Sequence, residues 1–229
     1  MLPLRLPSRL LQVLALCAFA LLPALSQATE QADAPRALME QTSQKMFDVL
    51  AQEKAAIHKH PQRLFEVVDE VLSPHVDYTL LSRWVLGRYW RTADAAQRER
   101  FIKEFHTLLV RFYSKALLDD PSQIDQLLAK RDSLITFLPT RPGESPREAS
   151  VRAQVNLAGT KPVPVSFSMY KEGDTWKVYD VNVDNISLAA TYRSTYASEI
   201  QRAGMNGLLD KMAEQNQNLL AKTTKAGAK

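Results

Sequence analysis

The chain has 229 residues, of which 45% are hydrophobic and 24% are charged, and 29 Lys and Arg residues outnumber 25 Asp and Glu residues. These proportions are close to the averages of globular proteins and exclude a collagen-like, coiled-coil or disordered chain. The single cysteine excludes a disulfide scaffold and a zinc site made of four thiolates.

Residues 1–28 have the pattern of a secretory signal peptide. Two arginines precede an apolar run from Leu10 to Leu22, and small residues stand where a signal peptidase would cleave after Ala28. The run is shorter than the roughly 20 residues that a transmembrane helix needs. We therefore expect a Sec-type signal peptide, cleaved before Thr29, and export to the periplasm. An uncleaved N-terminal anchor is the alternative.

The expected mature chain, residues 29–229, lacks the two arginines of the leader and its cysteine, Cys17. Its net charge is therefore +2 rather than the +4 of the full sequence. A nearly neutral protein lacks the concentrated positive charge of a nucleic-acid-binding domain. We expect residues 29–220 to form one soluble domain and residues 221–229 to form a flexible basic tail.

Apolar residues at helical spacing dominate the first part of the mature chain. The predicted helices cover about 35–58, 61–73, 77–86 and 95–118, with a short one ending near 130. The fourth is the clearest, because Asp94 and Gln97 have the spacing of a capping box. Towards the C-terminus, helical spacing resumes at Ala189 and stops at Gly204, and a last helix carries Leu208.

From about residue 134 the period of the apolar residues changes to two, which indicates strands. The predicted strands cover 134–138, 151–157, 163–170 and 176–183. In the last of them the alternation slips between Val178 and Tyr179, which indicates a β-bulge or a strand buried on both faces. The order predicts an α+β fold, with helices packed on a curved, mainly antiparallel sheet of about four strands.

Patterns that would indicate catalysis or metal binding are incomplete. His58 and His60 lie on different faces of a helix, and His106 lies beside an apolar stripe. Asp180–Asp184 is similar to the start of a calcium loop, but the glycine and the final glutamate of such a loop are missing. A glycine-rich phosphate loop is also missing. We therefore expect no enzymatic activity, no metal and no cofactor.

Several short stretches, in their order and spacing, are similar to those of a known family. They are Val85–Trp90 with Asp94, Gln97 and Phe101; Phe105, Phe112, Tyr113 and Leu117; Trp176–Val181; Asn185–Leu188; Tyr192 and Arg193; and Gly204 with Gly207 and Leu208. With the signal peptide, they resemble the periplasmic phospholipid carrier of the maintenance-of-lipid-asymmetry (Mla) system, also called the toluene-tolerance family, over residues 35–212. Asn185 stands where that family commonly has glycine, and residues 119–132 look longer and more helical.

The resemblance implies a periplasmic carrier that holds acyl tails in an apolar cavity between sheet and helices. It also implies exchange of lipid with an inner-membrane ABC transporter complex bearing an MCE-type ring and with an outer-membrane lipoprotein–porin complex. We expect the protein to be a monomer and to have no nucleic-acid partner. Because an exposed methylene costs about 0.8 kcal/mol, two acyl chains need a carrier to cross water.

We expect the tails to contact apolar residues of both helices and strands. The predicted lining is Trp84, Val85, Phe105, Leu109, Phe112, Val151, Val155, Val165, Phe167, Trp176, Val178, Ile186, Leu188 and Tyr192. Arg88 and Tyr89 are candidates for contact with the headgroup or a partner, and a capping and packing role is their alternative. Periodicity does not distinguish a lined cavity from a packed core.

Two other functions are compatible with the pattern. A small cone-fold enzyme would place ionisable groups inside the cone, and a buried Asp180 would favour it. A periplasmic adaptor or chaperone without a ligand would have a solid core and an exposed apolar patch. Lipid in the purified protein distinguishes the carrier from both.

Overall fold

The computed structural model describes residues 23–120, 122–139, 145–157 and 159–226, with side chains from Asp33 to Thr224. It divides into two units, Met1–Ala34 and Pro35–Lys229, and the second unit holds the fold. Most of the predicted signal peptide, including Cys17, lies outside the described residues. Its cleavage stays a prediction.

Helices precede and follow the sheet, as predicted. They are α2 (Pro23–Lys59), α3 (Arg63–Leu72), the 3₁₀ helix η1 (Ser73–His75), α4 (Tyr78–Leu86), α5 (Tyr89–Thr92), α6 (Ala95–Leu118), α7 (Ser122–Ala129), α8 (Arg131–Leu134) and α9 (Leu188–Ala226). Helix α2 begins at Pro23 rather than at Pro35, which lies inside it. The intervening segment is rich in Ala, Glu and Gln, which favour helix.

The predicted capping box at the start of α6 is confirmed. The Asp94 carboxylate accepts a hydrogen bond from the backbone N–H of Gln97 at 2.8 Å, and the Gln97 side chain accepts one from the N–H of Asp94 at 3.1 Å. These bonds satisfy two donors that have no partner inside the helix. From this start, α6 buries Phe101, Phe105 and Leu108.

The sheet has five strands in sequence order, all antiparallel, and is not closed. The strands are β1 (Ile135–Phe137), β2 (Glu148–Val155), β3 (Val163–Glu172), β4 (Thr175–Val183) and β5 (Ile186–Ser187). β5 was not predicted, because two residues are too few to show alternation. Asp184 and Asn185, which join β4 to β5, both have positive φ, at 51° and 63°. Asn tolerates this conformation, so it can stand where glycine is common.

The predicted β-bulge lies in β4. Ser168 pairs with Asp180, the next residue Met169 pairs with Val178, and Tyr179 is left as the extra residue. Because of this insertion, Val178 and Val181 lie on the same face of the sheet although three positions separate them.

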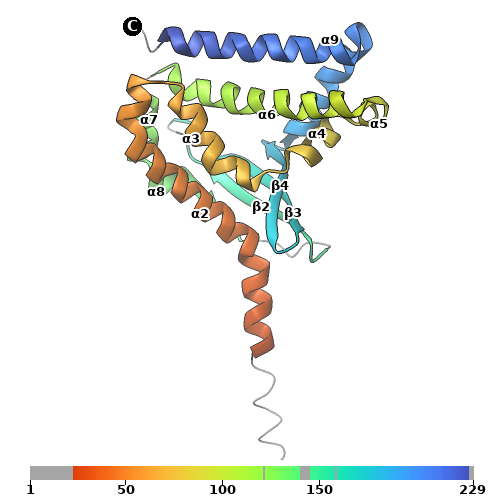
Figure 1. The fold of residues 1–229 in the computed structure, drawn as a ribbon. Helices are drawn as coiled ribbons and strands as arrows, with labels where there is room; N and C mark the ends of the chain where they lie inside the picture. The colour runs from red at the N-terminus through yellow and green to blue at the C-terminus, as the bar shows by residue number, and fades with distance from the viewer. Residues whose placement is uncertain (1–22, 121, 140–144, 158, 227–229) are drawn as a thin grey trace, which may run out of the picture. The chain divides into compact units, whose positions relative to one another are not determined.

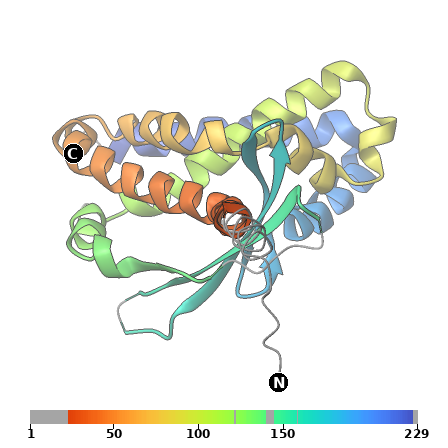
Figure 2. The same cartoon turned by 90° about the horizontal axis from the view of Figure 1, so that it is seen from below.

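Helices α4, α6 and α9 pack together in a helical core that includes Phe101, Phe105, Tyr196 and Leu208. Figure 1 shows α9 alongside α6, with the strands on the other side of α6, and Figure 2 shows the strands from below. A second cluster joins α2 to α3 and α7, and a third joins Leu38 and Met39 of α2 to the sheet.

Helix α9 is interrupted at Gly204, where the sequence predicts a helix end, and φ of 73° with ψ of 175° is a conformation that favours glycine. The structure differs from the predicted flexible tail, because α9 continues to Ala226. Thr223 is 3% exposed, and the Gln62 amide donates a hydrogen bond to the Thr224 hydroxyl at 2.6 Å. These contacts hold Thr223 and Thr224 against the rest of the protein, which the small, polar composition of this segment does not predict.

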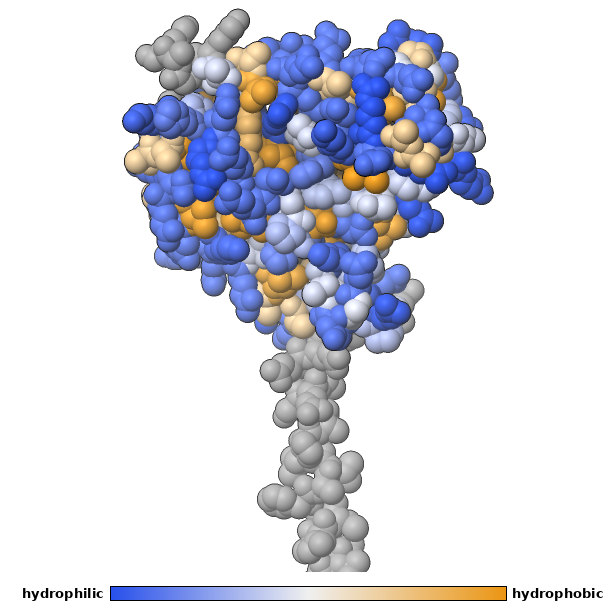
Figure 3. All heavy atoms as spheres, viewed as in Figure 1, coloured by the Kyte–Doolittle hydropathy of each residue, from blue (hydrophilic) through white to orange (hydrophobic). Residues whose placement is uncertain are grey.

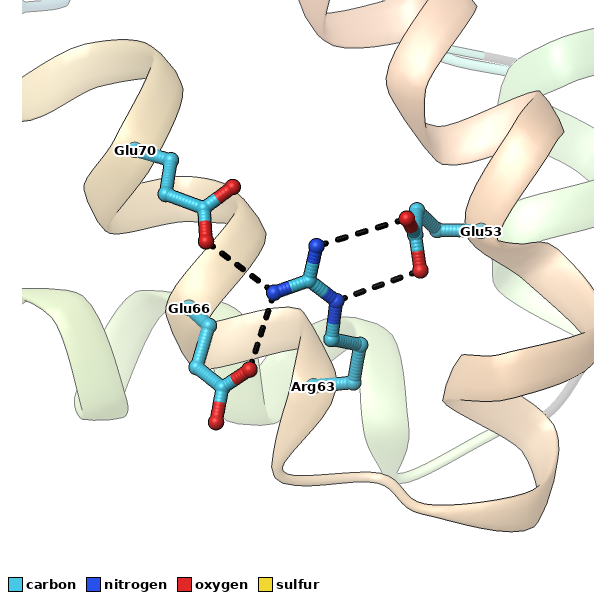
Figure 4. Close-up of polar contacts among 4 residues, drawn as sticks. All are labelled: Glu53, Arg63, Glu66 and Glu70. Carbon is cyan, nitrogen blue, oxygen red and sulfur yellow. Dashed lines mark hydrogen bonds and ion pairs between the residues drawn. The ribbon is translucent and has the colours of Figure 1, made fainter.

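A single arginine joins the end of α2 to α3 (Figure 4). The Arg63 guanidinium donates two hydrogen bonds to Glu53, at 3.1 and 3.3 Å, and contacts Glu66 at 2.9 Å and Glu70 at 3.0 Å. The hydrogen bond from Arg63 lowers the pKa of the Glu53 carboxyl. The Arg63 side chain is 26% exposed, so the network orients two helices at the surface rather than in the core.

The carboxylate of Asp180 connects the sheet to α9. Its Oδ1 accepts hydrogen bonds from the N–H groups of Val181 at 2.9 Å and Ala189 at 3.0 Å, and its Oδ2 accepts one from the Ser187 hydroxyl at 2.6 Å. The Ser187 hydroxyl accepts a further bond from the N–H of Ala190. The Asp180 carboxylate and the Ser187 hydroxyl thus accept hydrogen bonds from backbone N–H groups in the first turn of α9.

Replacing Asp180→Ala should lower the free energy of unfolding by about 2 kcal/mol, because a helix cap and two charge-assisted hydrogen bonds are lost together. Urea unfolding followed by tryptophan fluorescence measures the change. The matched control is Asp174→Ala, since Asp174 is fully exposed in the β3–β4 turn. Equal midpoints for the two variants would contradict this role of Asp180.

Candidate ligand-binding site

One face of the sheet is almost entirely apolar. Strand register and the bulge place the same side of all five strands together, and we call it the apolar face. It comprises Ile135, Phe137, Ala149, Val151, Ala153, Val155, Val163, Val165, Phe167, Met169, Trp176, Val178, Val181, Val183 and Ile186, with Lys171 opposite Trp176 as a charged residue at its end. The opposite, polar face carries Ser150, Arg152, Gln154, Ser166, Ser168, Tyr170, Asp180 and Asn182. This partition is typical of a sheet that is covered on one side.

The apolar face is covered in its middle and uncovered where β4 meets β5. Leu38 and Met39 of α2, with Val76, pack against its middle. At the β4–β5 end, Val183 is 47% exposed and Ile186 is 64% exposed. The protein therefore leaves apolar strand surface unfilled where β4 meets β5.

Aromatic side chains of α6 add to the exposed apolar surface. Phe112 is 48% exposed and Tyr113 is 50% exposed, and their rings contact each other at 5.3 Å. Tyr192 lies in the second turn of α9, just after β5. Its burial raises its pKa, and the neighbouring Tyr113 raises it further. The interaction between Tyr113 and Tyr192 shows that the second half of α6 lies near the start of α9. In Figure 3, the face in view carries hydrophobic residues as separate patches between hydrophilic ones.

A cavity of about 500 Å³ lies between α2 and the β1 edge of the sheet. Phe47, Ile135 and Phe137 are its apolar residues. The rest of its lining is polar or charged: Glu40, Ser43, Gln44, Asp48, Arg131, Asp132 and Thr136, with an ion pair between Asp48 and Arg131 at 2.8 Å. A second cavity, of about 360 Å³, lies between α3, α6 and α9 and includes Asp69 and His106. The first cavity adjoins the apolar face only through Ile135 and Phe137, and its lining is mostly polar.

The structure brings together half of the predicted lining on the apolar face: Val151, Val155, Val165, Phe167, Trp176, Val178 and Ile186. Phe112 stays exposed on α6, whereas Leu109 and Tyr192 pack at the edge of the helical core and Leu188 begins α9. Val85 and Phe105 are 1% and 0% exposed inside the helical core, so in this conformation other side chains surround them.

Trp84, Arg88 and Tyr89 lie elsewhere. The Trp84 ring lies 6.1 Å from that of Tyr179, which contacts Tyr170 of the polar face. Arg88 donates a hydrogen bond to the Tyr89 hydroxyl at 2.8 Å, and Gln201 of α9 donates another at 3.3 Å. The structure does not bring these three residues to the apolar face.

The predicted lining omitted Val181 and Val183, which face the same side as Val178. The slip in alternation at Tyr179 was the signal that could have found them, because an inserted residue reverses the parity of every later position. Ile135, Phe137 and Val163 were also omitted.

The polar groups near the site have structural partners. Asp180 is half-buried, and three donors occupy its carboxylate. His106 Nε2 contacts both Asp69, at 2.7 Å, and Ser73, at 3.0 Å. Since one nitrogen makes both contacts, the acid does not orient the other ring nitrogen as a catalytic triad requires. Within the described ranges, no group of three or more His, Cys, Asp or Glu residues could hold a metal ion, and no helix is long and apolar enough to cross a membrane.

Tyr170 fixes α4 to the sheet from the polar side. Its hydroxyl donates a hydrogen bond at 2.5 Å to Asp77, whose other carboxylate oxygen caps α4 at Leu80. The backbone N–H of Asp77 also donates to the carbonyl of Val178 at 2.9 Å. The hydrogen bond to Asp77 raises the pKa of Tyr170 to about 12.

We expect stability to fall between about pH 10 and pH 12. A raised pKa means that the folded state retains the Tyr170 proton better than the unfolded state, whose value is 10.0. The contribution is complete below pH 10 and is lost as the pH rises through the folded value. Urea midpoints measured across this range should decline less steeply for Tyr170→Phe. Parallel declines in the two proteins would contradict the assignment.

Comparisons with known proteins agree with this architecture. A family model described as "MlaC protein" matches residues 40–214. The toluene tolerance protein ttg2D of Pseudomonas putida is 28% identical over 80% of this chain and 81% of its own. The intermembrane phospholipid transport system binding protein MlaC of Haemophilus influenzae is 26% identical over 79% of this chain and 81% of its own. A solved phospholipid-binding protein from Ralstonia solanacearum, in complex with a phospholipid, is 26% identical, with a TM-score of 0.67 over 80% of this chain and 97% of its own.

Proposed function

Because this chain belongs to the MlaC protein family, we propose that it is a periplasmic phospholipid carrier whose acyl-tail site is built on the apolar face of the sheet. The observation that carries the proposal is the uncovered end of that face, where Ile186 is 64% exposed. The relatives support it, since one is named a phospholipid transport binding protein and the similar solved structure contains a phospholipid.

The energetics favour acyl chains as the occupant. Apolar surface removed from water contributes about 25 cal/mol per Å², and the apolar face offers this gain with few polar groups that need partners. The cavity of about 500 Å³ beside β1 is in the lower half of the range for small-molecule pockets. Two full acyl chains therefore need the uncovered β4–β5 end as well, or a movement of α2 away from the sheet.

We propose that the carrier moves lipid between an inner-membrane ABC transporter complex bearing an MCE-type ring and an outer-membrane lipoprotein–porin complex. Export by a signal peptide ending at Ala28 would place the protein between these membranes. An adaptor or chaperone without a ligand is the second candidate, and exposed Phe112 and Tyr113 of α6 are the observation that favours it.

Native mass spectrometry of residues 29–229, purified from a Gram-negative periplasm without detergent, tests the carrier directly. We expect a mass excess that solvent extraction identifies as a diacyl phospholipid. A mass equal to the polypeptide alone, with no uptake of lipid from liposomes, would favour the adaptor.

Substitutions on the two faces of the sheet locate the tails. Phe167→Glu and Ile186→Glu place a charge on the apolar face and should abolish co-purification of lipid, because a buried carboxylate next to acyl chains is unfavourable. The matched control is Ser166→Glu, which adds the same charge to the neighbouring position on the polar face and should keep the lipid.

Cooperative urea unfolding of each variant, with its lipid content, completes the test. Lipid retained in both apolar-face variants would contradict the proposed site. Lipid lost from all three variants would show that the charge acts without regard to the face.

A further inference from the structure

Arginines without acidic partners cluster around α4 and α5. From Tyr78 to Ala93 the chain has three arginines and neither an acid nor a lysine, and Arg193 is the only charged residue from Leu188 to Ser198. The four are Arg83, Arg88, Arg91 and Arg193, and none of them forms an ion pair among the described residues. Other arginines do form ion pairs: Arg36, Arg63, Arg100, Arg131 and Arg202.

Aromatic rings hold two of these arginines in place. The Arg193 guanidinium lies 5.7 Å from the Trp84 ring and donates through Nε to the Trp84 carbonyl at 2.6 Å. The Arg88 guanidinium lies 4.8 Å from the Tyr89 ring. Gly87 connects the two pairs, since a Cβ on it would lie 3.4 Å from Arg193. Side chains ordered in this way lose less entropy when they bind.

We call Trp84, Arg88, Tyr89, Arg91 and Arg193 the arginine–aromatic surface. Trp84 is 48% exposed, and Arg88, Arg91 and Arg193 are exposed. Trp84 stacks near Tyr179 on the side of the polar face, so this surface lies apart from the proposed acyl-tail site. Exposed Trp, Tyr and Arg are the residue types that contribute most binding energy in protein interfaces.

We propose that the arginine–aromatic surface is the docking site for an acidic surface of a partner protein. The inference rests on the proposed function, because a carrier must dock to release its lipid. Guanidinium groups bind carboxylates in a fixed, two-bond geometry, which suits a protein partner of defined shape. A lipid headgroup is a weaker occupant, since the Trp84 ring beside Arg193 lies near Tyr179 and Tyr170, on the opposite side of the sheet from the face that would hold the tails.

The test reverses the exposed charges and measures docking separately from lipid binding. The variant is Arg88→Glu with Arg91→Glu. Its matched control is Arg147→Glu with Lys161→Glu, which changes the net charge equally at exposed positions beside the sheet. Binding is measured to each membrane complex of the proposed function in nanodiscs of neutral lipid, and to vesicles rich in phosphatidylglycerol, at low and at physiological salt.

We expect the variant to bind at least one complex roughly tenfold more weakly than the control, with the difference larger at low salt. Its lipid content and thermal unfolding should equal those of the control. The proposal would be overturned if the variant and the control bound each complex with equal affinity. It would also be overturned if the variant lost binding to the anionic vesicles alone, or lost its bound lipid. Absence of lipid from the unsubstituted protein would instead contradict the proposed function.

Discussion

The carboxylate of Asp180 is the interaction on which the arrangement of sheet and helices depends. It receives a hydrogen bond from its own strand, one from β5 and one from the first turn of α9. The β4–β5 turn reverses the chain so that β5 pairs with β4. Where α9 begins, Asp180 and Ser187 accept hydrogen bonds from backbone N–H groups that have no partner inside the helix. Because α9 supplies Tyr196 and Leu208 to the helical core, this cap fixes one helix of the core to the sheet, as the Tyr170–Asp77 contact does for α4.

The bulge at Tyr179 makes the two faces of the sheet chemically distinct. Without an inserted residue, Asp180 would share a face with Val178 and would point into the apolar side. With it, Asp180 lies opposite Ser168 on the polar side, where α9 begins, and Val181 joins the apolar face. One extra residue thus directs the carboxylate to the helix and keeps charge away from the surface proposed to hold acyl chains.

Much of the fold could be predicted from local signals. The capping box at Asp94, the change of period near residue 134 and the slip at Tyr179 are properties of neighbouring residues, and the structure shows each of them. The prediction of the site was weaker because it needs distances between segments. Val85 and Phe112 both lie on apolar helical stripes, yet one is inside the helical core and the other is half exposed. Trp84 was assigned to the lining by its helical spacing and the family resemblance, whereas its contacts with Arg193 and Tyr179 depend on chain segments far away in sequence.

The order of the elements along the chain has a consequence for folding. The sheet is a meander of adjacent strands, so its contacts are local and can form early. The helical core has the opposite character, because α4 and α6 come before the sheet and their partner α9 is the last element. Phe101 and Phe105 therefore stay exposed to water until the final residues are available, and a chain still emerging from a ribosome or a membrane channel cannot complete this core. Such a delay keeps the helical core open while the chain is being made, and a polypeptide without a completed core can be threaded through a narrow pore more easily than a folded one.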